Sequence, residues 1–193
     1  HLVMQLVDDR VIALDTPIVK YLPKPLPSYE KYADLADDAR WERITPRMLL
    51  SHTSGLPNWR FFAPDQKLHL QFDPGAWFGY SGEGINLLQF VIEEHTGKSV
   101  GDMMQSRVFD RFGMTRTGMV WRPAIATELA MGYDTAGQIV GPNHRGTAPV
   151  AGSPAPDPAG PAGTLRPLRR RQAETRGCAP PTGAPPTPAP TRA

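Results

Sequence analysis

The sequence predicts an α+β fold made mainly of helices with one β-hairpin, followed by a long tail without regular structure. Several segments combine helical spacing of apolar residues with capping signals, and residues 128–141 have the pattern of a hairpin with Thr135-Ala136-Gly137 at its turn. No Phe, Trp or Tyr occurs after Tyr133, and from residue 148 the composition shifts to Ala, Pro, Gly and Arg. We therefore expect an organised part at 1–147 and a disordered tail at 148–193.

Two short helices are expected in the first third of the chain. Residues 1–7 (HLVMQLV) place apolar side chains on one side, which is typical of a helix end packed on a core. Thr45 is a good N-cap, and Pro46 occupies the first helical position, where its missing N–H costs nothing. Gly55 ends this second helical segment.

Two further helices are expected after residue 80. One begins near Ser81 and stops at Gly97, and the other begins at Ser99 and stops at Gly113. Ser99 and Asp102 have the spacing of a capping box. The apolar faces consist of Ile85, Leu88, Val91 and Ile92 in the first helix, and of Met103, Met104, Val108, Phe109 and Phe112 in the second.

The tail differs from the rest of the chain in composition and charge. Residues 150–193 hold 11 of the 22 prolines and carry six Arg against Asp157 and Glu174. A segment of this kind buries too little apolar surface to offset its chain entropy. Because the basic excess lies in the tail, the composition indicates no nucleic-acid partner for the folded part.

Other classes of site find no support in the sequence. Cys178, in the tail, is the single cysteine, so neither an intramolecular disulfide nor a cysteine zinc site can form. The histidines show no H-x-x-x-H or H-E-x-x-H spacing, so we expect no metal site and no cofactor. No apolar run approaches the ~18–20 residues that span a bilayer.

Two stretches could carry chemistry. Taken alone, residues 49–59 (LLSHTSGLPNW) predict a helix end and a Gly-Leu-Pro turn in which His52 and Ser54 bond backbone groups. In the second stretch, residues 72–99, Tyr80 directly precedes a helix N-terminus, whose partial positive charge favours a phenolate. Such a tyrosine can act as a general base, and a turn tyrosine that anchors the helix is the alternative interpretation.

Four motifs in order resemble those of the serine β-lactamase-related hydrolases, which include class C β-lactamases, DD-peptidases and their esterase relatives. The motifs are LLSHTSGLP, F-x-PG-x-x-F-x-YS, a helix that ends in TGKS, and RFGMTRTGM at 111–119. Residues 3–23 also resemble the segment that follows the nucleophile helix in that family. The similarity covers about residues 2–147.

The resemblance implies acyl transfer, in which the serine of a Ser-x-x-Lys motif attacks a carbonyl. The lysine and a tyrosine manage the proton, and backbone N–H groups hold the oxyanion. Tyr80 matches the tyrosine of the family motif and is the catalytic residue that the resemblance implies. Ser81 matches the middle position, although its expected role is N-cap. The family often has Asn at the third position of the motif, where this chain has Gly82. The missing amide side chain favours an esterase or peptidase-like relative over an ordinary β-lactamase.

No nucleophile is expected among these residues. The resemblance implies that a Ser-x-x-Lys motif should lie just upstream of His1. Ser28 and Lys31 have the letters of the motif, but they follow a proline-rich connection and come after the segment that should follow the nucleophile, so a solvated loop is expected. His144-Arg145-Gly146 has the letters of a later His-x-Gly motif and is interpreted as coincidence.

These observations predict a fragment of a serine hydrolase, mainly the helical part of the serine β-lactamase/DD-peptidase-like fold plus a hairpin. The intact protein would act on an ester, amide or β-lactam bond of a small-molecule or peptide-like substrate through an acyl-enzyme, and the fragment alone is expected to be inactive. The family suggests a periplasmic or secreted location.

Two alternatives concern the tail. In the first, the chain is a non-catalytic helical module whose Pro/Arg-rich tail binds a partner. In the second, the tail is a reading frame translated out of register after Gly152. The nucleotide sequence in all three frames would decide between them.

Overall fold

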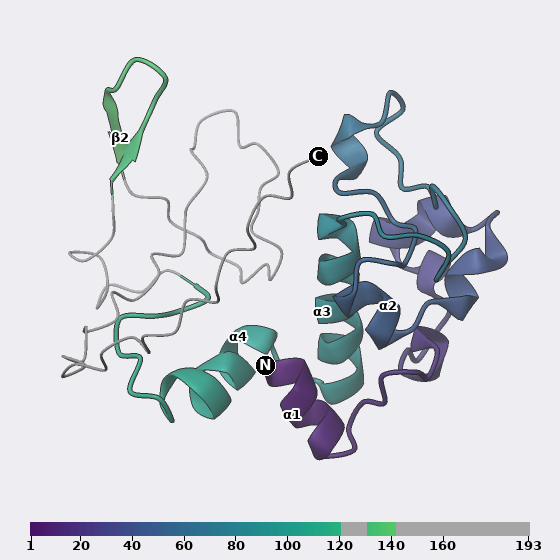
Figure 1. Ribbon diagram of the computed structural model, residues 1–193, viewed down its shortest axis with the longest axis horizontal. Helices are drawn as coiled ribbons and strands as arrows, with labels where there is room; N and C mark the ends of the chain where they lie inside the picture. The colour runs from purple at the N-terminus through teal and green to yellow at the C-terminus, as the bar shows by residue number, and fades with distance from the viewer. Residues whose placement is uncertain (121–130, 142–193) are drawn as a thin grey trace, which may run out of the picture.

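The computed structural model describes residues 1–120 and 131–141 (Figure 1). Over these residues it is mostly helical with one antiparallel hairpin, as the sequence predicts. The regular elements are α1 (Leu2–Asp8), α2 (Pro46–Leu50), α3 (Gly82–Thr96), α4 (Val100–Met104), β1 (Gly132–Tyr133) and β2 (Ile139–Gly141). Short 3₁₀ turns connect them: η1 (Ile18–Lys20), η2 (Leu26–Ser28), η3 (Glu30–Leu35), η4 (Ala39–Arg43) and η5 (Arg60–Phe62), and a π-helical turn, η6 (Gln105–Phe109), follows α4.

The helix α3 is the longest element and lies at the centre of the helical part. In Figure 1 it stands upright, with α2 and the loop-rich segment 10–80 along one side and α1 near its lower end. The Oγ of Ser81 caps it by accepting the N–H of Gly84 at 2.7 Å. At the other end Gly97 adopts a left-handed φ of +65°. Both predicted limits are confirmed.

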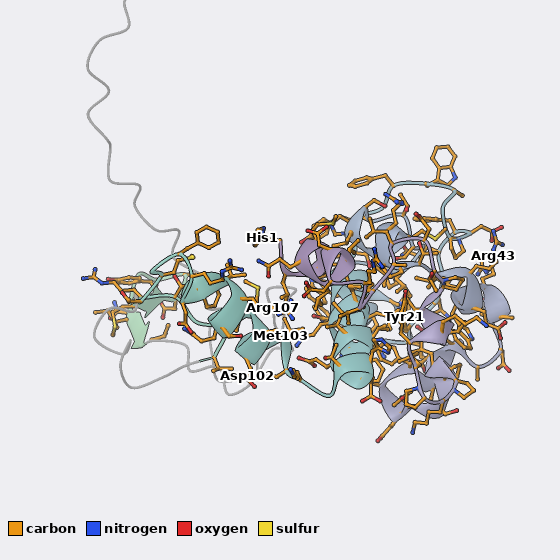
Figure 2. All side chains as sticks on the ribbon, turned by 90° about the horizontal axis from the view of Figure 1, so that it is seen from below. His1, Tyr21, Arg43, Asp102, Met103 and Arg107 are labelled. Carbon is orange, nitrogen blue, oxygen red and sulfur yellow. The ribbon has the colours of Figure 1, made fainter. Side chains whose placement is uncertain are left out.

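A single hydrophobic cluster joins α1, the 3₁₀ turns η1 to η4, α2, α3 and α4. Even the proline-rich connection contributes to it, since Leu26 is fully buried. The ring of Tyr21, labelled in Figure 2, packs edge-on against His95 of α3 with 5.0 Å between ring centroids. The loops before α2 therefore cover α3 and hold it in place. The innermost apolar side chains, each at most 1% exposed, are those of Leu6, Ile18, Leu26, Tyr32, Leu35, Ile44, Leu49, Leu56, Leu68, Leu87 and Val91.

The helix α2 is shorter than the sequence predicts. Thr45 caps it as expected, by accepting the N–H of Met48 at 3.3 Å. The helix nevertheless ends at Leu50, before the predicted stop at Gly55, because His52 adopts a left-handed φ of +57° that cannot continue an α-helix.

The helix α4 extends away from α3, and the turn η6 that follows it is bonded to α1. Ser99 caps it as predicted, by accepting the N–H of Asp102 at 3.0 Å. Figure 2 shows Asp102 on the outer side of α4 and Met103, which is buried, towards the body of the molecule. Arg107 of η6 forms an ion pair with Asp9 at the end of α1. An apolar cavity of about 320 Å³ lies between these helices, with Leu2, Leu88, Ile92, Val100 and Met104 in its lining.

Phe112 is not part of the apolar face that the sequence predicts. It is 67% exposed and makes an edge contact with the ring of His1. In the π-helical turn, the N–H of Asp110 bonds the carbonyl of Gln105 at 2.9 Å, which inserts one extra residue into the helical path. The extra residue rotates the following positions away from the buried face.

The hairpin is confirmed where the structure describes it. Gly132 pairs with Gly141, and Tyr133 pairs with Ile139. The Oδ1 of Asp134 closes the turn by accepting the N–H groups of Ala136 at 2.9 Å and Gln138 at 2.8 Å. In Figure 1 the hairpin stands apart from α3.

Some predictions fall outside the described residues. They concern the first residues of the hairpin (128–130), the His144 motif and the tail at 148–193 with Cys178. Among the helices that the structure describes, none has the length and apolar character needed to cross a bilayer.

Candidate functional site

Tyr80 lies two residues before α3 and exposes 61% of its surface. Within residues 1–120 and 131–141 no group forms a hydrogen bond with its hydroxyl. Its phenolic oxygen is therefore exposed and not engaged by any group of these residues.

The two stretches that the sequence singles out lie side by side. We call residues 51–58 the HTSG loop and residues 71–81 the tyrosine loop. Backbone N–H groups of the tyrosine loop donate to carbonyl oxygens of the HTSG loop at three points: Gln71 to Gly55 at 2.8 Å, Gly75 to Thr53 at 2.7 Å and Gly79 to His52 at 2.8 Å. These bonds attach the segment that carries Tyr80 to the end of α2.

Gly55 permits this close approach. Its φ is +85°, and a Cβ at this position would lie 2.3 Å from the carbonyl oxygen of Phe72. No other residue fits without displacing the tyrosine loop. The glycine of the LLSHTSGLP motif therefore has a structural role in the contact between the loops.

The N-terminus of α3 is closed by the protein itself. Asn58 accepts the N–H of Gly82 through Oδ1 at 3.2 Å and the N–H of Glu83 through its carbonyl oxygen at 3.0 Å. Ser81 accepts the N–H of Gly84 and donates its own hydroxyl proton to the carbonyl of Pro57 at 2.9 Å. Ser81 is therefore the predicted N-cap, and these helix N–H groups are occupied.

Gly82 has no room for a side chain. A Cβ there would lie 2.6 Å from the Cη2 atom of Trp59 and 2.9 Å from the carbonyl oxygen of Asn58. The ring of Trp59 stacks on that of Phe61, with centroids 5.9 Å apart and an interplanar angle of 10°. An asparagine at position 82 would require Trp59 to move.

His52 bonds a backbone group, as the sequence predicts, and its partner is next to Tyr80. Its Nδ1 accepts the N–H of Ser81 at 3.2 Å, and its ring lies 4.6 Å from the Tyr80 ring at 36°. Ser54 likewise accepts a backbone N–H, that of Leu56, at 3.4 Å. Local pattern contains no signal for the His52–Ser81 contact, because the partners are 29 residues apart.

A largely buried ion pair fixes the other side of the α3 N-terminus. Arg60 donates from Nε to Oε1 of Glu83 at 2.9 Å and from Nη2 to Oε2 at 3.0 Å. Burial opposes the charge on Arg60, but the hydrogen bonds and the attraction of Glu83 outweigh it and raise the pKa of the guanidinium. The same guanidinium donates to the carbonyl of Lys31 at 2.7 Å. Arg60 thus joins η5, η3 and α3.

A sequence model of the family described as Beta-lactamase matches residues 1–173. The chain belongs to the beta-lactamase family. Penicillin-binding protein 4* of Bacillus subtilis is 31% identical over 130 residues, which are 53% of this chain and 28% of that protein. The lovastatin esterase of Penicillium rubens is 28% identical over 138 residues, which are 58% of this chain and 34% of the esterase. The chain thus spans about a third of the length of these relatives.

Solved structures share the fold. A β-lactamase/D-alanine carboxypeptidase of Yersinia pestis superposes with a TM-score of 0.54 at 21% identity, covering 78% of this chain and 43% of that one. A D-amino acid amidase of Ochrobactrum anthropi, solved with L-phenylalanine, superposes with a TM-score of 0.51 at 28% identity, covering 69% and 40%. The predicted family and its fold are confirmed.

A Ser-x-x-Lys nucleophile motif of the beta-lactamase family needs its serine and lysine on one helix. Ser28 and Lys31 do not meet this requirement. Ser28 is exposed at the end of η2, Lys31 lies in η3, and Tyr29 between them is extended at φ −93° and ψ 129°. Burial lowers the pKa of Lys31. Among the described residues, no cluster of three His, Cys, Asp or Glu side chains could hold a metal ion.

Proposed function

We propose that this chain is the tyrosine-bearing part of a serine hydrolase that cleaves ester, amide or β-lactam bonds through an acyl-enzyme, with Tyr80 as its general base. One observation carries the proposal. Tyr80 stands at the tyrosine position of the family motif, with an exposed ring, a hydroxyl that no described residue bonds, and a backbone attached to the HTSG loop on both sides.

The proposed reaction uses Tyr80 twice. As a phenolate it takes the proton of a serine hydroxyl while that oxygen attacks the carbonyl carbon of the substrate. As a phenol it then returns the proton to the oxygen or nitrogen of the leaving group, and the acyl-enzyme remains. In the second half of the reaction, water attacks this ester and gives a proton to the Tyr80 phenolate. The phenol then returns the proton to the serine oxygen as the acyl group leaves. A positioned acid/base of this kind typically accelerates the reaction by about 10²–10⁴-fold.

The proposed substrates are esters or small amides, in preference to β-lactams. Gly82 supports this choice, because Trp59 fills the space beside it and leaves no room for a substrate-binding amide side chain. Two comparisons agree with it, since one relative is called a lovastatin esterase and one structural neighbour is a D-amino acid amidase.

The test is Tyr80→Phe in a version of the chain extended upstream with a Ser-x-x-Lys helix and downstream with the remaining sheet. We expect kcat on p-nitrophenyl acetate to fall by about 10²–10⁴-fold, since only the acid/base oxygen is removed. Tyr133→Phe is the matched control, because Tyr133 is also 61% exposed; its kcat should be unchanged. Near-normal turnover by a folded Tyr80→Phe protein would show that Tyr80 only anchors the turn.

A further inference from the structure

We propose that His52 is a positioning residue for Tyr80. It holds the backbone on both sides of Tyr80 and packs its imidazole against the Tyr80 ring, so that the phenolic oxygen keeps one direction. The catalytic consequence rests on the proposed function, in which Tyr80 is the base, whereas the contact itself is independent of it.

The backbone contacts come from one residue. The carbonyl oxygen of His52 accepts the N–H of Gly79 at 2.8 Å, and its Nδ1 accepts the N–H of Ser81 at 3.2 Å. Gly79 and Ser81 are the two neighbours of Tyr80 in the sequence. The Gly79 N–H belongs to the Phe78–Gly79 peptide and the Ser81 N–H to the Tyr80–Ser81 peptide, so His52 holds the main chain one peptide before the residue pair Gly79–Tyr80 and directly after Tyr80.

The side-chain contact restricts the ring itself. The imidazole lies 4.6 Å from the Tyr80 ring at 36°, and the Phe78 ring lies edge-on to the imidazole at 6.0 Å and 89°. Tyr80 is otherwise mostly exposed, and within the described residues His52 provides its one aromatic contact. The position of the phenol therefore depends on the imidazole.

His52 has a strained backbone conformation at the point where it bonds Gly79 and Ser81. Its φ of +57° is left-handed, which side chains with a Cβ adopt at a cost and keep where the surroundings impose it. Here it lets the main-chain oxygen and Nδ1 reach the same neighbouring loop. Arg10 and Gln66 also have a positive φ, at 59° and 55°, but they lie in other turns.

The chemistry of the contact suggests a graded set of variants. Since Nδ1 accepts a hydrogen bond, the neutral ring carries its proton on Nε2. Asparagine tolerates the left-handed conformation, and its Oδ1 can replace Nδ1 as the acceptor. Glycine keeps the conformation and the main-chain oxygen but removes both the acceptor and the ring. Gln66→Gly is the matched control for relief of left-handed strain elsewhere.

The first measurement is amide hydrogen exchange by NMR on the full ¹⁵N-labelled chain. In His52→Gly we expect the Ser81 amide to exchange roughly fivefold faster, the effect of losing one hydrogen bond, while the Gly79 amide stays within twofold. His52→Asn should return Ser81 to within twofold of the parent, and Gln66→Gly should change neither amide. Equal protection of Ser81 in His52→Gly would overturn the proposal.

The second measurement uses the extended hydrolase. In His52→Gly we expect kcat to fall by about 10-fold or more with KM within twofold, because a displaced base slows the chemical step more than binding. His52→Asn should recover part of that loss. Faster Ser81 exchange with an unchanged kcat would overturn the positioning role. If Tyr80→Phe itself keeps full activity, the proposed function fails, and the exchange experiment still decides whether His52 holds the turn.

Discussion

At the scale of single residues, the contact between the HTSG and tyrosine loops depends on Gly55. A Cβ at this position would lie 2.3 Å from the carbonyl oxygen of Phe72, on a backbone with φ +85°. We expect Gly55→Ala to lower the free energy of unfolding by about 3 kcal/mol or more, because left-handed strain and a backbone clash act together. Urea unfolding of the full chain, followed by far-ultraviolet circular dichroism, measures this loss.

Gly97→Ala is the control for the strain alone. Gly97 also has a positive φ, at +65°, but nothing lies within 4 Å of the place where its Cβ would be. Its substitution should cost about 1–2 kcal/mol. If the two variants lost the same stability, the close approach at Phe72 would not be the cause of the Gly55 effect.

At the scale of elements, the Arg60–Glu83 pair attaches η5 to the first turn of α3. The Glu83 side chain is 8% exposed and that of Arg60 is 22% exposed. We expect Arg60→Met, which keeps most of the aliphatic packing, to lower the free energy of unfolding by about 3 kcal/mol, because a buried carboxylate loses its partner. Thermal and urea unfolding of the full chain provide the measurement.

Arg47→Met tests whether burial decides the size of this effect. Arg47 also makes two hydrogen bonds with one carboxylate, that of Asp15, at 2.6 and 2.7 Å. These side chains are 56% and 71% exposed, so water screens the pair and little stability should be lost. A loss as large as that of Arg60→Met would contradict the explanation.

At the scale of the whole molecule, the proposed acyl transfer would require a nucleophile aligned with Tyr80. The one Ser-x-x-Lys in the 193 residues is at Ser28 and Lys31, and the structure divides it between η2 and η3. We expect the chain on its own to hydrolyse p-nitrophenyl acetate and nitrocefin at the buffer rate, because alignment can supply about 7–11 kcal/mol of barrier reduction that this pair does not receive. Initial rates with purified protein test this.

Ser28→Ala is the companion variant for these assays. It should behave as the parent chain does, since Ser28 is exposed and lies in a separate turn from Lys31. Turnover well above the buffer rate that disappears in Ser28→Ala would identify Ser28 as a nucleophile and show that the chain is active without further segments.

The sequence by itself determined the N-caps of three helices, the stop of α3 and the family. The caps at Thr45, Ser81 and Ser99 and the stop at Gly97 were predictable, because a capping bond joins residues within about four positions of each other. The order of motifs identified the family, and the motif pointed to Tyr80, whose catalytic role stays a prediction.

Only the tertiary structure decided what surrounds Tyr80. His52 contacts Ser81, and Trp59 closes the space beside Gly82; in both cases the partners are 23 or more residues apart in the sequence. The early end of α2 depends on the left-handed backbone of His52. The exposure of Phe112 follows from an extra residue in the helical path at η6. Helical spacing and capping act along the chain, whereas packing and left-handed strain are set by segments that meet only after folding.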